Sequence, residues 1–375
     1  MKELQFLHKI GKAIKMKEEL QPMEYYIGCD AHKKYSIFTG ISEKGEILAA
    51  KRVEHKNKDH YRLYLQTLPA GSRIAVETIG SWYWMIDEME KAGHYPQLVH
   101  AQRAKLMMGQ TNKTDKLDAR GLAILARNGT LPTVWIPSGD IRDQRELPRM
   151  RMAMTQVRTK FKNRIHATMA KYGITFEEVT DLFGGKGRKL LQERLHELPP
   201  ETRSCVQAEL KLLDQVIESI TEVEKHIREV ISMNADMQLL LTMPGVGPIL
   251  AIVIALEIGD VSRFPSAEKL ASYAGKTPRV KSSGGKTYYG RVRPDVNRYL
   301  KWAFTEAANA IVLQQHTIGD CHVLRLYQRI YQHKGHPKAI TAVGRHLAEA
   351  TFNILKKHEP YREPGGKGKG STRME

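Results

Sequence analysis

Four carboxylates occur in local contexts that suit a metal-dependent nuclease. They are Asp30, Glu77, Asp115 and Asp118. Asp30 ends the apolar run YYIGCD, and Glu77 ends a second run, IAVE. Asp115 and Asp118 are spaced i and i+3 at the start of a helical pattern, which places both side chains on one helix face. Because Mg2+, or Mn2+ in its place, takes oxygen ligands beside a phosphate, the acids indicate metal-assisted phosphoryl transfer.

Aspartates at a helix start also have a purely structural explanation. They accept hydrogen bonds from free backbone N–H groups and complement the helix dipole. This explanation is adequate for Asp115 alone, but it does not account for Asp30, which lies beside the apolar run of an expected central strand. An uncompensated charge there is costly. The histidines show no HExxH or other ligand spacing, so we expect them to be structural or exposed.

The segments around the acids predict an α/β domain. An antiparallel meander of three strands is expected at 25–29, 35–42 and 46–53. Helices and strands then alternate: helix 58–67, strand 74–76, helix 82–92, strand 96–99 and a helix from 115 to about 128. This is the element order of a ribonuclease-H-like (Holliday-junction-resolvase-like) fold. In such a fold, acids on the first strand, the fourth strand and a late helix converge at one edge of the sheet.

The composition favours a polyanionic partner. Lys and Arg number 59 against 41 Asp and Glu, a formal charge of +18, so nucleic acid is the leading candidate. The three cysteines show no zinc spacing, which indicates a reducing cytosol, bacterial or archaeal. The basic N-terminal arm lacks the apolar segment of a secretory signal. The apolar stretch 239–258 is interrupted by Pro and Gly, so two short buried helices are expected rather than a membrane span.

The second half of the chain is expected to be mainly helical. Segments 146–172 and 189–234 have apolar residues at helical spacing and predict long, paired helices, or a coiled coil. The turn PGVGP then resembles a helix-hairpin-helix, in which Gly245 and Gly247 present N–H groups to a phosphate; a tight turn between core helices is the alternative. A loop, SSGGK, and a helix over 295–313 follow.

We therefore expect five parts. They are a basic arm (1–22), a ribonuclease-H-like catalytic domain (23–145), a helical coiled-coil spacer (146–235), a C-terminal domain with the hairpin turn and a serine loop (236–358) and a disordered tail (359–375).

The ordered motifs resemble those of a known family. The motifs are YIGCDAHKK, AVETIG and NKTDKLDAR in the first half, and MPGVGPILAIVIALEIGDVSRF, LASYAGKTPRV, SSGGK and VNRYLKWAFTEAA in the second. Together they resemble the DEDD-type insertion-sequence transposases of the bridge-RNA-guided family, which is related to the Piv-type DNA invertases.

The resemblance implies specific roles. Asp30, Glu77, Asp115 and Asp118 would bind the metal, and Ser283 would be the nucleophile that forms a phosphoserine link to DNA, with Ser282 a close competitor because the serine is doubled. It further implies donor and target DNA, a structured bridge RNA, and a dimer or tetramer with composite active sites.

The residues around Ser283 suit contact with DNA, and two alternatives stay open. Gly284 would let the backbone approach DNA, and Lys286 and Arg279 would contact phosphates. One alternative is a Holliday-junction-type resolvase that uses metal-activated water, so that Ser283 is incidental. The other is a non-enzymatic nucleic-acid-binding protein, which has no need of the four acids.

Overall fold

The computed structural model describes residues 25–109 and 114–364. The chain divides into two compact units, Met1–Ile136 and Pro137–Glu375, and each is described by itself. The expected basic arm at 1–22 and the segment 365–375 of the expected tail lie outside the described residues. The division of the second unit into a spacer and a C-terminal domain stays a prediction.

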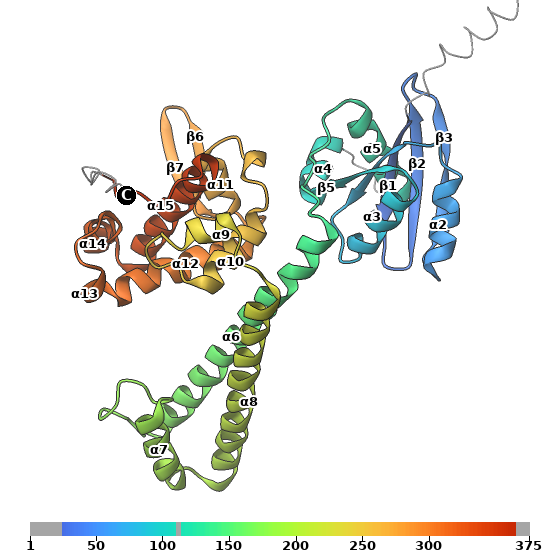
Figure 1. Cartoon of the computed structure of the whole chain (residues 1–375). Helices are drawn as coiled ribbons and strands as arrows, with labels where there is room; N and C mark the ends of the chain where they lie inside the picture. The colour runs from blue at the N-terminus through green and yellow to red at the C-terminus, as the bar shows by residue number, and fades with distance from the viewer. Residues whose placement is uncertain (1–24, 110–113, 365–375) are drawn as a thin grey trace, which may run out of the picture. The chain divides into compact units, whose positions relative to one another are not determined.

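The first unit contains a mixed five-stranded sheet in the order β3-β2-β1-β4-β5 (Figure 1). Strands β1, β2 and β3 form an antiparallel meander, and β4 and β5 join β1 in parallel. The elements are β1 (Tyr25–Ala31), β2 (Tyr35–Ser42), β3 (Ile47–Glu54), α2 (Lys58–Gln66), β4 (Arg73–Glu77), α3 (Trp82–Lys91), β5 (Tyr95–Val99), α4 (Ala101–Met108) and α5 (Asp115–Arg127). This mixed α/β arrangement confirms the expected element order, with α4 as an additional helix that was not expected.

Helices cover both faces of the sheet. On one face, the β1 residues Ile27 and Cys29 pack with Tyr61 of α2 and Met85 of α3. On the other face, Ala75 and residues of α5 form a second apolar cluster. Side chains alternate between the two faces along a strand, and both faces of the central strands are covered by helices. Strands β1 and β4 are therefore nearly continuous apolar runs.

The second unit begins with two long helices, α6 (Gly139–Lys171) and α8 (Pro200–Val230), which lie side by side in Figure 1. Ion pairs show that they run antiparallel, because Arg151 pairs with Glu224 while Arg164, further along α6, pairs with the earlier Glu209. Helix α7 (Gly185–Arg194) and the short η1 (Leu195–Glu197) connect them. The expectation of long paired helices is confirmed.

Helix α6 starts earlier than the sequence pattern predicts. The pattern of apolar residues at helical spacing places the start near residue 146, and the helix was not expected to extend before Pro148. In the structure Ser138 caps the helix by accepting a hydrogen bond from the N–H of Ile141, and the helix continues through Pro148. The preceding turns are held by burial of Arg142 and Arg145, a tertiary effect that the local sequence does not reveal.

The rest of the second unit is a helical body with one β-hairpin. Its elements are α9 (Ala235–Leu240), α10 (Pro248–Ile258), η2 (Val261–Arg263), α11 (Ala267–Tyr273), β6 (Pro278–Ser283), β7 (Lys286–Val292), α12 (Arg298–Leu313), α13 (Gln315–Ile318), α14 (His322–Lys334) and α15 (His336–Lys357). Helix α10 is buried and packs with α12 and α15 in the largest apolar cluster. In the part of the chain that the structure describes, no helix combines the length and apolarity that crossing a bilayer requires.

Two expectations for this unit are wrong. The serine segment is not a loop but a hairpin, because Gly284 and Gly285 both have positive φ (56° and 73°) and so form the two-residue turn that favours strand pairing. The expectation of disorder from residue 359 is also wrong for the described residues 359–364. The N–H of Tyr361 donates to the hydroxyl of Thr242 at 2.8 Å, and Glu363 accepts from the N–H of His322, so these residues pack on the body.

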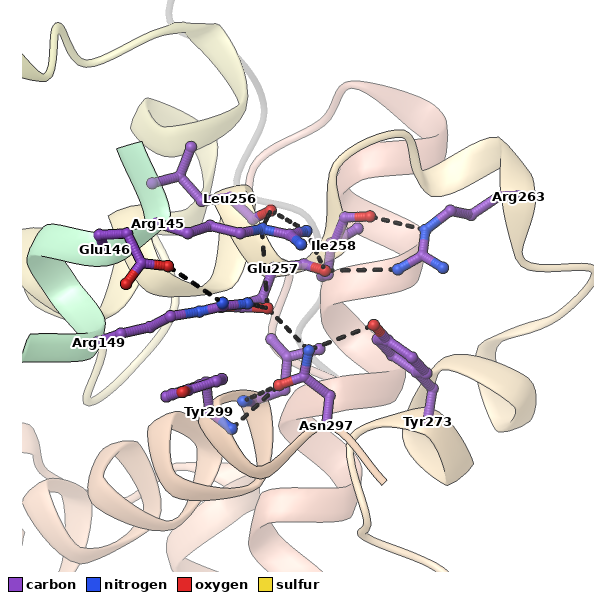
Figure 2. A network of polar contacts seen from close by, with 11 residues as sticks. Arg145, Glu146, Arg149, Leu256, Glu257, Ile258, Arg263, Tyr273, Asn297 and Tyr299 are labelled. Carbon is purple, nitrogen blue, oxygen red and sulfur yellow. Dashed lines mark hydrogen bonds and ion pairs between the residues drawn. The ribbon is translucent and has the colours of Figure 1, made fainter. Parts of the chain in front are cut away.

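A buried polar network joins α6, α10 and α12 (Figure 2). Its centre is Glu257, which is 2% exposed and accepts hydrogen bonds from Arg149 and Asn297. Arg145 donates to the backbone carbonyls of Leu256 and Glu257 near the end of α10. Because Asn297 also caps α12 through its Oδ1, the network sets the starting point of the helix that follows the hairpin.

Candidate active site

The parallel pairing of β1 and β4 positions two of the four acids. Cys29 pairs with Val76, so the next residues, Asp30 and Glu77, lie side by side at the same end of the two strands. Each is 8% exposed, although each is ionisable. Burial of two carboxylates beside each other at a strand end is costly unless a cation or hydrogen bonds compensate. His32 supplies part of this compensation for Asp30.

Helix α5 lies on the face of the sheet that carries these acids. A Cβ added to Gly28 would lie 1.8 Å from the carbonyl oxygen of Ala119, so the helix backbone rests directly on β1 at this glycine. Gly28 and Asp30 share a face, because side chains two residues apart in a strand point the same way. Ala75 packs with Leu122 of α5, which places Glu77 on that face as well.

The first turn of α5 brings the other two acids to this sheet edge. Thr114 caps the helix by accepting a hydrogen bond from the N–H of Leu117 at 3.3 Å. Asp115 and Asp118 therefore lie in the first turn of α5, just before Ala119, the residue that contacts β1. Their charges act on Asp30, and both raise its pKa. The four predicted acids thus converge at one edge of one sheet.

A histidine lies within this acidic group. The Nε2 atom of His32 is 3.1 Å from Oδ2 of Asp30 and 3.4 Å from Oδ2 of Asp115. Donor atoms of these three residues all lie within 4.8 Å of one another, a group of described residues that does not include Glu77 or Asp118. The hydroxyl of Tyr35 donates a 2.9 Å hydrogen bond to Oδ2 of Asp115.

The electrostatics of the site favour a bound cation. Burial raises the pKa of Asp30, and the carboxylates of Asp115 and Asp118 raise it further, while His32 acts in the opposite direction. Clustered carboxylate oxygens at a partly exposed edge are the donor set that Mg2+ and Mn2+ take. The residues present therefore fit a divalent ion held by Asp30 and Asp115, with Glu77 and Asp118 beside them.

His32 lies within the acidic group and Tyr35 contacts it, and sequence reasoning singled out neither of these neighbours of the acids. The available signal was the position of His32 two residues after an acid at a strand end, in DAHKK. The short turn between β1 and β2 returns the chain toward α5, and this places both side chains beside Asp115.

In the hairpin β6–β7, the adjacent residues Ser282 and Ser283 lie on opposite faces. Ser283 pairs with Lys286, and Lys281 pairs with Tyr288. Because cross-strand partners share a face and neighbours alternate, one face carries Ser283 together with Lys281, Lys286 and Tyr288. The whole of β6 is exposed, so this face is open to solvent.

Ser282 occupies the opposite face. It pairs with Thr287, and their hydroxyl oxygens are 2.9 Å apart, so the Ser282 hydroxyl is engaged in a hydrogen bond. Val280 and Tyr289 are its other neighbours on that face, and neither carries a charge. Lys281 and Lys286 therefore share the face of Ser283, whereas none of these neighbours of Ser282 is charged. Which of the two serines reacts stays a prediction.

The remaining predicted nucleic-acid contacts lie at separate places in the second unit. Gly247 caps α10, and Gly245 has φ 74° with its Cβ position 2.2 Å from the carbonyl oxygen of Ala307. Close packing against α12 therefore gives Gly245 a structural reason, and its contact with a phosphate stays a prediction. Arg279 lies on β6, and Gly284 and Lys286 lie at or beside the turn of the hairpin.

Comparison with known protein families finds a match in each half of the chain. Residues 27–174 match a model of the DEDD transposases of IS110 type, described as "Transposase". Residues 237–321 match a model described as "Transposase IS116/IS110/IS902 family". The sheet with its four acids and these matches define a DEDD transposase.

Similar proteins extend the match over nearly the whole length. The transposase for insertion sequence element IS1111A of Coxiella burnetii is 24% identical over 358 residues, 95% of this chain and 96% of that protein. The transposase for IS1328 of Yersinia enterocolitica is 27% identical over 70% of this chain and 76% of its own. The mini-circle putative transposase for IS117 of Streptomyces coelicolor is 35% identical over 30% of each chain. The chain belongs to the insertion-sequence transposases of the IS110/IS116/IS902 family.

Proposed function

We propose that this transposase cuts and rejoins donor and target DNA through a covalent link to Ser283, assisted by Mg2+ or Mn2+ held by Asp30, Glu77, Asp115 and Asp118. The observation that carries the proposal is the convergence of these acids at one sheet edge, with Asp30 and Asp115 close enough to share an ion. When bound, the ion would offset negative charge that develops on the reacting phosphate.

The covalent step is a phosphoryl transfer. The Ser283 oxygen forms a bond to phosphorus, the bond from phosphorus to the leaving deoxyribose oxygen breaks, the serine proton passes to a base or solvent, and the leaving oxygen takes up a proton. The number of phosphate ester bonds is unchanged, so the link retains the energy that rejoining needs. Lys281 and Lys286 support this role, because they share the hairpin face of Ser283 and attract a phosphate.

The partners follow from the resemblance. We propose that a structured bridge RNA specifies donor and target DNA, and that the chain acts as a dimer or tetramer in which the acids of one subunit meet the serine of another. The +18 charge supports binding to both nucleic acids. Recombination that continues unchanged after ribonuclease treatment and removal of RNA would contradict RNA guidance and leave the nuclease chemistry in place.

The test of the chemistry combines strand transfer with detection of a protein–DNA adduct. Asp30→Asn and Glu77→Gln are expected to abolish cleavage while circular dichroism shows a folded chain. Ser283→Ala is expected to abolish both strand transfer and a detergent-stable adduct, and Ser282→Ala, the matched control, retains them.

Mass spectrometry of the nuclease-trimmed adduct identifies the modified residue. An adduct on Ser282 would reassign the nucleophile. Cleavage by Ser283→Ala without any adduct would favour the alternative, a resolvase that uses metal-activated water. Full activity of a folded variant without the acids would exclude the metal mechanism.

A further inference from the structure

We propose that His32 is a nitrogen ligand of the metal site, in addition to the carboxylates, and that it makes this site prefer first-row transition ions such as Mn2+ over Mg2+. The inference rests on the proposed metal site and deepens it. The three donor atoms of Asp30, His32 and Asp115 within 4.8 Å of one another are the observation that carries it.

The position of the imidazole is set by its surroundings. His32 lies in the turn between β1 and β2, where its backbone N–H donates to the carbonyl of Tyr35 at 2.8 Å. Its ring lies 4.6 Å from the Tyr35 ring, measured between centroids. Tyr35 is held in turn by its hydrogen bond to Asp115 and by the guanidinium of Arg52, 3.4 Å from the centre of its ring. The histidine is thus directed at the acids by a fixed aromatic neighbour.

The atom nearest the acids is the one that a metal would use. Nε2 lies 3.1 Å from Asp30 Oδ2 and 3.4 Å from Asp115 Oδ2, so in this structure an Nε2–H group can serve as donor to the carboxylates. With the proton on Nδ1 instead, the Nε2 lone pair points into the same space. When no ion is bound, Nε2 can donate a hydrogen bond to the carboxylates. When an ion is bound, the same nitrogen can serve as a ligand beside them.

A second histidine beside this sheet, His55, has contacts typical of a structural role. His55 is close to β2, but its Nε2 is 2.8 Å from the hydroxyl of Ser36, and burial lowers its pKa. It contacts no carboxylate of the site among the described residues. Imidazole is a better ligand for first-row transition ions, of which Mn2+ binds it most weakly, than for Mg2+, which prefers oxygen and keeps its waters. Replacement of His32 should therefore weaken Mn2+ binding more than Mg2+ binding.

The experiment uses the full chain carrying Ser283→Ala, which leaves the metal site intact, with Mn2+ alone as the probe. Pulsed electron paramagnetic resonance detects a nitrogen directly bonded to Mn2+. The parent protein is expected to show this nitrogen coupling, and the coupling should change when the protein is labelled with 15N-histidine. The coupling should be absent from His32→Ala and His32→Gln. The control His60→Ala changes an exposed histidine of the same unit and should keep it.

Titration of the same proteins gives the second readout. His32→Ala is expected to weaken Mn2+ binding by roughly tenfold or more, the loss typical of groups that support a metal, with a smaller change for Mg2+. Binding of Mn2+ by the parent without nitrogen coupling, or coupling that persists in both His32 variants, would overturn the role of His32 and leave the carboxylate site standing. No Mn2+ binding to the parent, or binding unaffected by Asp30→Asn, would instead refute the proposed metal site itself.

Discussion

Arg149 of α6 donates two hydrogen bonds to the carboxylate of Glu257 in α10, from Nε at 2.7 Å and from Nη2 at 3.1 Å. This two-pronged contact has the geometry in which a guanidinium and a carboxylate interact most strongly. The side chain of Glu257 is 3% exposed and that of Arg149 20%, so the carboxylate is shielded from solvent and the guanidinium only in part. The start of the long helical pair is therefore joined to the helical body by a buried charge.

Removal of that charge should destabilise the second unit. Glu257→Gln keeps the shape of the side chain but removes the carboxylate that pairs with Arg149 and with the buried Arg145. We expect the free energy of unfolding to fall by about 3 to 5 kcal/mol, the usual cost of breaking a buried ion pair on one side. Thermal and chemical unfolding of the full chain measure this.

The control for this variant is a solvent-accessible pair in the same unit. Glu349→Gln removes the partner of Arg345 on α15, where the two side chains are 29% and 45% exposed. A loss of less than about 1 kcal/mol is expected there. Equal losses in the two variants would show that the Glu257 contact has no special weight.

Gly28→Ala should separate α5 from β1. The new methyl group would fall 1.8 Å from the carbonyl oxygen of Ala119, and backbone at that distance cannot yield without moving the helix. Overpacking of this kind costs typically 1 to 3 kcal/mol and more where backbone must shift, so we expect a loss of at least about 3 kcal/mol. Mn2+ affinity should fall as well, because α5 carries Asp115 and Asp118.

The matched substitution is Gly80→Ala in the same unit. Gly80 has nothing within 4 Å of its Cβ position, so this variant should unfold near the wild-type midpoint and bind Mn2+ normally. If Gly28→Ala behaves like Gly80→Ala, then the close approach of α5 to β1 is not needed to position the acids.

Lys276 should make stability depend on alkaline pH. It is 3% exposed, its Nζ donates to Thr305 Oγ1 at 2.6 Å, and burial, reinforced by the charge of Lys301, lowers its pKa to about 8. Between about pH 8 and 10 the unfolded chain therefore holds a proton that the folded chain has released. Stability should rise with pH across this window, by about 3 kcal/mol at most.

Lys276→Met is the variant that isolates this effect. It should be more stable than the wild type at pH 7, and the difference between the two proteins should shrink as the pH approaches 10. The measurement is the difference in unfolding midpoint at several pH values. A difference that stays constant with pH would show that Lys276 titrates normally.

The charges on the Ser283 face should contribute to DNA binding without reading sequence. Lys281→Gln and Lys286→Gln are each expected to weaken binding to all DNA sequences alike and to reduce the slope of log affinity against log salt by about one. Thr287→Val changes the opposite face of the hairpin and removes no charge, so it gives the baseline. An unchanged salt slope in both lysine variants would exclude phosphate contacts at this face.

The first unit could be predicted closely from the sequence because its signals are local. Strand β2 was expected at 35–42 and is found there, since it is an apolar run that a Glu-Lys-Gly turn ends. The helix carrying Asp115 was equally visible from the helical pattern that runs to about residue 128, although its cap is Thr114. The contact between Gly28 and Ala119 was not predictable, because it joins residues far apart in the chain whose approach depends on the finished sheet.

The hairpin and His32 show two different limits. Every residue of β6 is exposed, so no alternation of apolar and polar residues marks it as a strand, and the two glycines were the available signal. His32 does not lie at a recognisable ligand spacing, because its partners are Asp30, two residues away, and Asp115, on another element. A site assembled from separate elements has no sequence period.

The side-chain amide of Asn297 forms hydrogen bonds to two helices, α12 and α10. Its oxygen accepts the N–H groups of Tyr299 and Leu300 at the start of α12, and its nitrogen donates to Glu257 at 2.8 Å. The residue at which the chain leaves the hairpin and enters α12 is therefore anchored to α10 and, through its backbone N–H and the carbonyl of Tyr273, to α11. A displacement of β7 is opposed at its base by bonds to three helices at once.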